Sequence, residues 1–141
     1  MKKLIKNSIL VGLVIVSAGV VKATEDYYPS TVQVGYPYKL VGQYRDFGAG
    51  EQRIELNKAY PASETRQTIE VEYQQKNALW SSSLGSQQVE IIYKDFTVFS
   101  KTLNFGSQKY SGKRRYIFYN NLFNQNNTAV FIDDVRMYPK A

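Results

Sequence analysis

Hydrophobic and polar residues alternate along most of this chain from residue 24 onward. The clearest case is Ile69, Val71 and Tyr73, which are separated by two glutamates. A period of two places successive side chains on opposite faces of a β-strand. These three hydrophobic side chains are therefore expected in the core, and Glu70 and Glu72 on the solvent side.

The same period recurs in further short segments, whereas a helical period is absent over any useful length. Strands are predicted at residues 31–36, 38–44, 53–56, 68–73, 89–94, 96–99, 116–119 and 129–132, a turn at 46–50, and one short helical turn at 57–65. The strand pattern also predicts core positions for Tyr73, Tyr93, Phe118 and Phe131. Regularly spaced short strands are typical of an all-β sandwich or barrel, here as one domain over residues 24–141.

The segment that precedes this domain, residues 1–23, has a different pattern, which is typical of a secretory signal peptide. Three lysines precede an apolar run over residues 9–21, and Val21-Lys22-Ala23 ends it with small residues. Signal peptidase cleaves after such a sequence, and the run is shorter than the roughly 20 residues of a membrane span. We expect cleavage before Thr24 and a secreted domain over residues 24–141, with an uncleaved N-terminal anchor as the alternative.

Removal of this segment changes the charge of the protein. The whole chain carries +6, but the segment 1–23 holds four of its 18 basic side chains and none of its 12 acidic ones. The remaining domain has 14 − 12 = +2. Such a small excess does not indicate a nucleic-acid-binding domain, so no nucleic-acid partner is expected.

Two residue types are missing from the chain, and their absence excludes several chemistries. There is no cysteine and no histidine. Disulfide bonds, Ser-His-Asp and Cys-His catalysis, and histidine-ligated zinc or iron are therefore excluded.

The C-terminal segment carries a resemblance to a known fold family. Residues 128–138 read Thr-Ala-Val-Phe-Ile-Asp-Asp-Val-Arg-Met-Tyr, with Phe131-Ile132-Asp133-Asp134-Val135 at the centre. This segment resembles the closing strand of galactose-binding-like jelly rolls, which include carbohydrate-binding modules and the third domain of insecticidal crystal toxins. The order of the strands from residue 66 onward is similar as well. The resemblance implies an antiparallel jelly-roll β-sandwich that binds carbohydrate.

The resemblance also raises the question of calcium, since many such jelly rolls hold a structural calcium ion. Asp133 or Asp134 would supply the C-terminal ligand, and Glu25 or Asp26 a ligand from the first strand. Calcium needs six to eight oxygen ligands, including backbone carbonyls that a sequence does not reveal. The alternative is that both aspartates stabilise the last strand through local hydrogen bonds.

Aromatic residues are the main candidates for a ligand-binding surface. Tyrosine and tryptophan stack on sugar rings while their polar edges reach hydroxyl groups. The candidates expected in loops or at sheet edges are Trp80, Tyr27, Tyr28, Tyr36, Tyr44 and Tyr110. Trp80 lies in the polar segment 77–83. It could form a sugar platform, or it could be a buried plug at one end of the sandwich, as tryptophan is heavily buried on average.

A basic cluster surrounds Tyr110, with Lys109 before it and Lys113, Arg114 and Arg115 after it. In a loop before a strand, it could contact an anionic polymer or surface: teichoic acid, acidic polysaccharide, anionic lipid headgroups or nucleic acid. The alternative is a solvated loop whose charges prevent pairing of sheet edges.

No enzymatic site emerges from these patterns. Glu70 and Glu72 lie about 7 Å apart on one strand face, a spacing that glycosidases use but that solvent-facing strands also produce. We therefore expect a secreted, non-catalytic domain that binds carbohydrate or another cell-envelope polymer, without stable membrane insertion. The alternatives are a structural or protein-interaction factor at the cell surface and a toxin-related receptor-binding module.

Overall fold

The computed structural model describes residues 26–63, 65–93, 99–123 and 126–141. Its β-strands are β1 (Tyr28–Val34), β2 (Lys39–Val41), β3 (Arg45–Phe47), β4 (Gly50–Pro61), β5 (Arg66–Lys76), β6 (Ser81–Ile92), β7 (Phe99–Gln108), β8 (Gly112–Tyr119) and β9 (Val130–Tyr138). In these ranges, no helix has the length and apolar character needed to cross a membrane.

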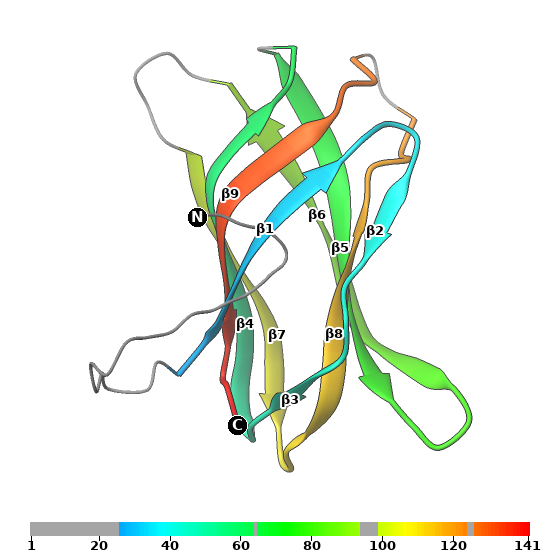
Figure 1. The fold of residues 1–141 in the computed structure, drawn as a ribbon, viewed down its shortest axis with the longest axis vertical. Helices are drawn as coiled ribbons and strands as arrows, with labels where there is room; N and C mark the ends of the chain where they lie inside the picture. The colour runs from blue at the N-terminus through cyan, green and yellow to red at the C-terminus, as the bar shows by residue number, and fades with distance from the viewer. Residues whose placement is uncertain (1–25, 64, 94–98, 124–125) are drawn as a thin grey trace, which may run out of the picture.

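The strands form two antiparallel sheets that lie face to face (Figure 1). One sheet has the order β1-β9-β4-β7, and the other has the order β2-β8-β5-β6 with β3 also paired to β8. Because β2 and β3 pair with successive parts of β8, they act as one interrupted strand. The resulting eight-strand order, 1-8-3-6 in one sheet and 2-7-4-5 in the other, is that of a jelly roll. The predicted all-β sandwich of jelly-roll type is confirmed.

The core lies between the sheets and follows the alternation in the sequence. Ile69, Val71 and Tyr73 are fully buried, as predicted, and β5 lies between β6 and β8 in the middle of its sheet. Phe118 is buried as well, whereas Tyr93 is only half-buried. The core position predicted for Phe131 is wrong, because its neighbours Val130 and Ile132 face inward and the Phe131 ring stacks on Tyr60 instead.

Several local predictions differ from the structure. The helical turn expected within 57–65 is absent over residues 57–61, since β4 continues to Pro61, and residue 64 lies outside the described residues. Within β4 the pairing shifts at Lys58, which has a left-handed φ of 57°, and this irregularity lets the strand continue. The predicted turn at 46–50 is partly strand, and most of the predicted strand at 96–99 lies outside the described residues.

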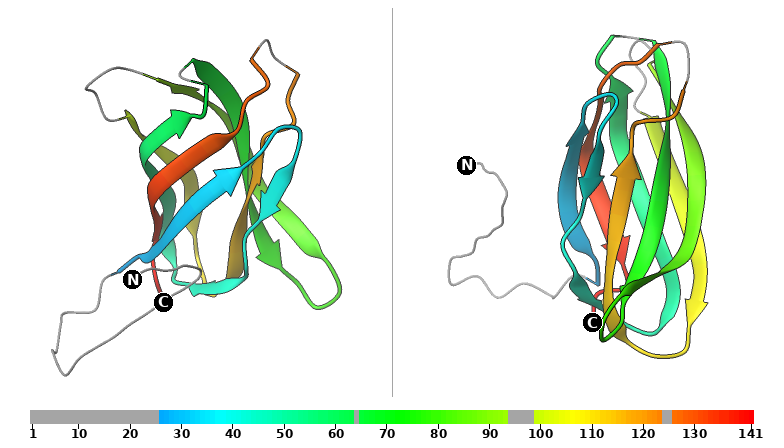
Figure 2. Two further views of the ribbon diagram at one scale, coloured as in Figure 1. Left: turned by 45° about the horizontal axis from the view of Figure 1, so that its top comes forward. Right: turned by 90° about the vertical axis from the view of Figure 1, so that its right-hand side faces the viewer.

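The β5–β6 hairpin extends beyond the rest of the sandwich at the bottom right of Figure 1. The pairing in this hairpin shifts between Tyr73 and Gln74, opposite Gly85, whose φ of 148° suits glycine. The β3–β4 and β7–β8 turns lie at the same end, which we call the hairpin end (Figure 2). The β1–β2 connection and the β8–β9 loop lie at the opposite end.

Candidate functional site

The outer surface of the sheet formed by β2, β3, β5, β6 and β8, here called the five-stranded face, carries the candidate site. Its centre is β8, because this strand pairs with β5 on one side and with β2 and β3 on the other. Arg115 lies opposite Gln74, and Lys113 lies opposite Asp46. Strand alternation therefore places Lys113 and Arg115 on the outer face, with Arg114 between them pointing into the sandwich.

Polar side chains on this face form one hydrogen-bonded row across β8 and β5. Arg115 Nε donates to Gln74 Oε1 at 2.9 Å, and Gln74 Nε2 donates to Glu72 Oε1 at 3.2 Å. The Tyr119 hydroxyl donates to the same Glu72 oxygen at 2.7 Å. These half-buried groups are held in fixed positions, as is needed for polar groups that orient a ligand.

The electrostatics of the row follow from these bonds. Burial alone raises the pKa of Glu72, but hydrogen bonds from Tyr119, Ser83 and Gln74 and the charge of Arg115 together lower it below its ordinary value. Burial, the bond to Glu72 and the charges of Glu72 and Glu70 raise the pKa of Tyr119 to about 12. At neutral pH the row therefore has a carboxylate, a guanidinium, an amide and a neutral phenol.

Tyr44, in the link between β2 and β3, lies beside this row. The Arg115 guanidinium is 4.4 Å from the centre of the Tyr44 ring, and the Lys76 ammonium is 5.7 Å from it. The Tyr44 hydroxyl is hydrogen-bonded to the Ser81 hydroxyl on β6. Tyr44 thus links β8 to the turn end of the β5–β6 hairpin and positions two cations there.

The turn of this hairpin carries two exposed large apolar side chains. The backbone N–H of Asn77 donates to the Trp80 carbonyl at 2.8 Å and closes the turn. Leu79 is 91% exposed and Trp80 is 62% exposed. Trp80 is therefore not the buried plug that was one of its two interpretations. The segment 77–83 is also not a loop throughout, because β6 begins at Ser81.

The basic cluster predicted as a loop lies instead within β8, apart from Lys109. Lys113 Nζ contacts Asp46 Oδ1 at 2.8 Å, and this hydrogen bond and charge raise the pKa of Lys113. Arg114 is only 1% exposed, so its side chain is not available to a ligand at the surface. Its guanidinium bonds to Gln75, Gln52 and two backbone carbonyls. Only Lys113 and Arg115 of this strand's basic residues reach the five-stranded face.

The remaining aromatic candidates are in different places. Tyr110 is 70% exposed in the β7–β8 turn at the hairpin end. Tyr28 donates its hydroxyl to the Asp46 carbonyl at 2.6 Å and packs edge-on against Phe47, so it joins β1 to β3. Tyr27 packs against Tyr138 of the other sheet. Tyr44, Trp80 and Tyr110 thus lie at the hairpin end, Tyr28 contacts β3 near the same end, and Tyr27 packs on the other sheet.

Within the described residues, Asp133 and Asp134 are not part of a cluster of three or more acidic side chains. Both carboxylate oxygens of Asp134 accept hydrogen bonds from Arg136, at 3.1 and 3.2 Å. Across the described ranges, no three acidic residues lie close enough together to hold a metal ion. Glu25, one of the predicted partners, lies outside these ranges. The bonds of Asp134 favour the alternative of local stabilisation, and calcium binding stays a prediction.

Comparisons with known proteins give a likeness in fold and no family. No protein-family model matches the chain, and no curated protein matches it. A solved structure described as "CBM4 structure and function" is similar over 79% of this chain and 61% of its own length, with 18% identity and a TM-score of 0.45. A family two carbohydrate esterase from Cellvibrio japonicus is similar over 82% of this chain and 36% of its own, with 12% identity and a TM-score of 0.36.

Proposed function

We propose that this protein binds a polysaccharide or another polymer of the cell envelope, without catalysis, at the hairpin end of the five-stranded face. The observation that carries this proposal is an exposed tryptophan in a hairpin whose first β6 residue, Ser81, is bonded to Tyr44 beside a pre-formed polar row. Trp80 is 62% exposed at the hairpin turn, while Tyr44 joins Ser81, the residue after Trp80, to Arg115 in the row. Sugar-binding surfaces combine an aromatic platform with fixed hydrogen-bonding groups in this way.

Trp80 suits the role of platform because, within the described residues, its ring is not stacked on another ring or covered by a cation. Among the described residues, it has neither an aromatic nor a cationic partner. An exposed indole costs the free protein little stability, yet it buries a large apolar area when a sugar ring stacks on it. Tyr44 has the complementary role of positioning Arg115 and Lys76.

The charges at this end favour an anionic polymer. Lys113 is paired with Asp46, but Lys76 and Lys109 have no carboxylate within ion-pair distance in the described part of the chain. Arg115 bonds to a neutral amide rather than to a carboxylate. These cations would attract phosphate or carboxylate groups of a wall polymer, and binding should weaken as salt is added.

The carboxylate pair of this face supports binding rather than hydrolysis. A glycosidase needs one carboxyl group that stays protonated near neutral pH, so its pKa must be raised. Three hydrogen bonds and the Arg115 charge instead lower the pKa of Glu72 despite its partial burial. Glu72 is suited to accept hydrogen bonds from a ligand and not to donate a proton to a leaving group.

The test is retention of the purified protein on immobilised polysaccharides and teichoic acids, followed by the same assay on variants. We expect Trp80→Ala and Arg115→Gln each to reduce retention at least about tenfold. Phe123→Ala is the matched control, since Phe123 is 96% exposed in the β8–β9 loop, which lies at the opposite end of the sandwich. Loss of retention in Phe123→Ala to the same degree, or no retention of the unmodified protein on any polymer, would contradict the proposal.

A protein partner is the second candidate, because Leu79 is 91% exposed next to Trp80. An aliphatic side chain does not stack on a sugar ring, whereas a Leu-Trp pair fits a hydrophobic groove in a protein. Leu79→Ser separates the two functions. Polysaccharide binding should survive this substitution, and docking into a protein groove should not.

The place of action outside the cytoplasm rests on the N-terminal segment 1–23. Cleavage before Thr24 gives a secreted protein with a defined N-terminus and mass. Intact-mass analysis of culture supernatant should find a chain that begins at Thr24. Full-length protein retained in the membrane fraction would contradict secretion.

A further inference from the structure

Apolar side chains are exposed at two turns of the hairpin end. Leu79 and Trp80 are exposed in the β5–β6 turn, and Tyr110 is exposed in the β7–β8 turn. Figures 1 and 2 both place these turns at the same end of the sandwich. A sugar ring stacks on an aromatic ring and not on a leucine, so polymer binding does not account for Leu79. A surface that presents leucine, tryptophan and tyrosine together is typical of contact with an apolar partner.

The β5–β6 hairpin orders its side chains by their distance from its tip. The last strand pair is Lys76 with Ser81, and the hydrogen bond from the Asn77 N–H to the Trp80 carbonyl closes the turn beyond this pair. Leu79 and Trp80 therefore lie in the turn, and Lys76 lies at least one residue further back, a rise of roughly 3.4 Å. At a bilayer surface, a leucine enters the edge of the hydrocarbon, a tryptophan lies at headgroup level, and a lysine reaches back to the headgroups. The hairpin has its side chains in this order.

Cations accompany the exposed apolar side chains of both turns. Lys76 belongs to the first hairpin, and Lys109 directly precedes Tyr110, with its ammonium 5.7 Å from the centre of the Tyr110 ring. Arg115 lies on the five-stranded face beside the first hairpin. In the described part of the chain, none of these three cations has an ion pair. Their charge is complementary to a surface of anionic lipid headgroups.

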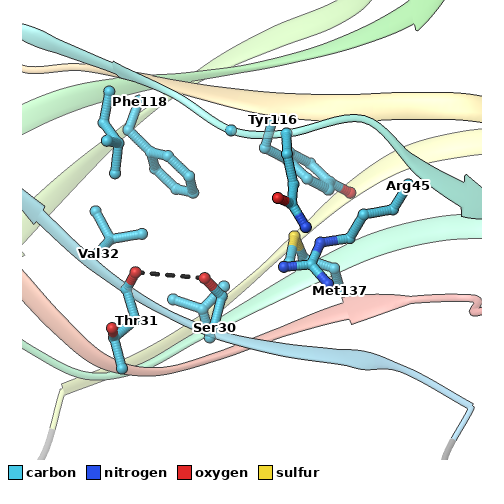
Figure 3. A pocket seen from close by; sticks show the side chains of 11 residues that line it. Ser30, Thr31, Val32, Arg45, Tyr116, Phe118 and Met137 are labelled. Atoms are coloured by element: carbon cyan, nitrogen blue, oxygen red, sulfur yellow. Dashed lines mark hydrogen bonds between the residues drawn. The ribbon is translucent and has the colours of Figure 1, made fainter. Parts of the chain in front are cut away.

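Two other basic residues near this end are engaged elsewhere. Lys113 is paired with Asp46, with 2.8 Å between its ammonium and the carboxylate. Arg45 in β3 lines a small pocket between the two sheets, and Figure 3 shows its side chain beside Met137 and Tyr116. A contact made by the turns of the hairpin end therefore relies on the three unpaired cations.

We propose that the hairpin end docks on the surface of an anionic lipid bilayer. Leu79 and Trp80 enter the interface, and Tyr110 contacts it from the second turn. The unpaired cations lie against the headgroups. Shallow apolar insertion and electrostatic attraction are each weak, but together they give reversible binding to a membrane surface. This contact goes beyond polymer binding and does not depend on it, because Leu79 and Tyr110 belong only to the membrane contact, whereas Trp80 is common to both.

The test is a titration of the protein recovered from culture supernatant with vesicles of equal parts phosphatidylglycerol and phosphatidylcholine. Trp80 is the only tryptophan in the sequence, so the fluorescence of the protein reports directly on the hairpin turn. We expect a saturable shift of this emission to shorter wavelength, and co-sedimentation that weakens as salt is added. Vesicles of phosphatidylcholine alone should bind at least about tenfold more weakly. Equal binding to both vesicles, or binding without the emission shift, would overturn the proposal.

Matched variants locate the contact without disturbing the core. Leu79→Ser should weaken binding to the anionic vesicles at least about tenfold, whereas Phe123→Ala, at an exposed aromatic residue of the β8–β9 loop, should not alter it. Lys109→Gln should weaken binding roughly fivefold, whereas Lys39→Gln, at an exposed lysine of β2, should have little effect. Unaltered vesicle binding in Leu79→Ser, or an equal loss in Phe123→Ala, would overturn the assignment. Retention on a polymer without any vesicle binding would overturn this proposal alone and leave polymer binding intact.

Discussion

Arg114 and Arg115 are neighbours with the same chemistry, but the fold gives them opposite roles, and this contrast allows a sharp prediction. Arg114 Nε donates to Gln75 Oε1 at 2.9 Å, and its terminal nitrogens donate to the carbonyls of Gly48 and Tyr110 and to Gln52. It therefore ties the β3–β4 and β7–β8 turns to β5 from inside the sandwich. Arg114→Met keeps most of the buried volume and removes every one of these bonds.

The size of the effect follows from which acceptors lose their only donor. Gln52 Oε1 retains the Tyr73 hydroxyl at 2.5 Å, and the Gly48 carbonyl retains Gln52 Nε2 at 2.9 Å. Gln75 Oε1 and the Tyr110 carbonyl are left without the donor that they had in Arg114. An unsatisfied buried acceptor costs about 1–3 kcal/mol, and because these two acceptors are only partly buried, we expect a loss of about 2–4 kcal/mol in the free energy of unfolding, the lower part of that sum.

Arg115→Met is the matched control, because it removes one hydrogen bond to Gln74 and the contact with the Tyr44 ring on the solvent side. We expect a loss of about 1 kcal/mol or less from it. Urea denaturation of both variants and of the unmodified protein measures the difference, provided that all three share the same slope of unfolding free energy against urea concentration. Equal losses in the two variants, or a smaller loss in Arg114→Met, would refute the inward orientation of Arg114.

Three further predictions concern the five-stranded sheet. Val71→Asp buries an unpaired charge and should prevent folding, whereas Glu70→Ser on the outer face should cost roughly 0.5 kcal/mol or less; circular dichroism and urea denaturation distinguish these outcomes. Because the folded protein lowers the pKa of Glu72, its contribution to stability is in place above the ordinary value of 4.5 and is lost as the pH falls through the lower folded value. We therefore expect the free energy of unfolding, measured from neutral to acidic pH, to fall less in Glu72→Gln than in the unmodified protein. Trp80→Ala should lower the free energy of unfolding by about 1 kcal/mol or less, since the side chain is 62% exposed; a loss near the roughly 3–5 kcal/mol of a buried tryptophan would contradict its exposure.

The sequence was informative where one local pattern decides the structure. The alternation around Val71 is enough to assign its two faces, because each residue of a strand points opposite to the next. The jelly roll was predicted from the closing strand around Ile132-Asp133 and from strand spacing, and the strand order confirms it. The residues that pair across β5 and β8 could not be predicted, since register depends on contacts between distant segments.

The candidate site illustrates the same limit. A run of three basic residues at Lys113, Arg114 and Arg115 reads as a charged loop, and only the pairing of β8 with β5 and β3 shows that Arg114 is buried. The search for aromatic residues in loops and at sheet edges selected Tyr44 and Trp80, but it did not identify the polar residues near them. Gln74, Glu72 and Tyr119 belong to the site because pairing between β5 and β8 aligns them, and no local motif marks them.

The exposure of Trp80 also depends on long-range structure. The β5–β6 hairpin continues past the sandwich, so that its turn has no opposite sheet to pack against (Figure 1). This exposure has no signature in the sequence.

The central claim is that the hairpin end of the five-stranded face binds a cell-envelope polymer. Its most direct test is an NMR map of backbone and side-chain shifts on addition of an oligosaccharide fragment of the best-retained polymer. The account predicts that the largest shifts fall on Trp80, Tyr44, Gln74 and Arg115, and that the outer face of the β1-β9-β4-β7 sheet is unaffected. Shifts concentrated on that other sheet, or at Phe123 on the opposite end, would contradict it.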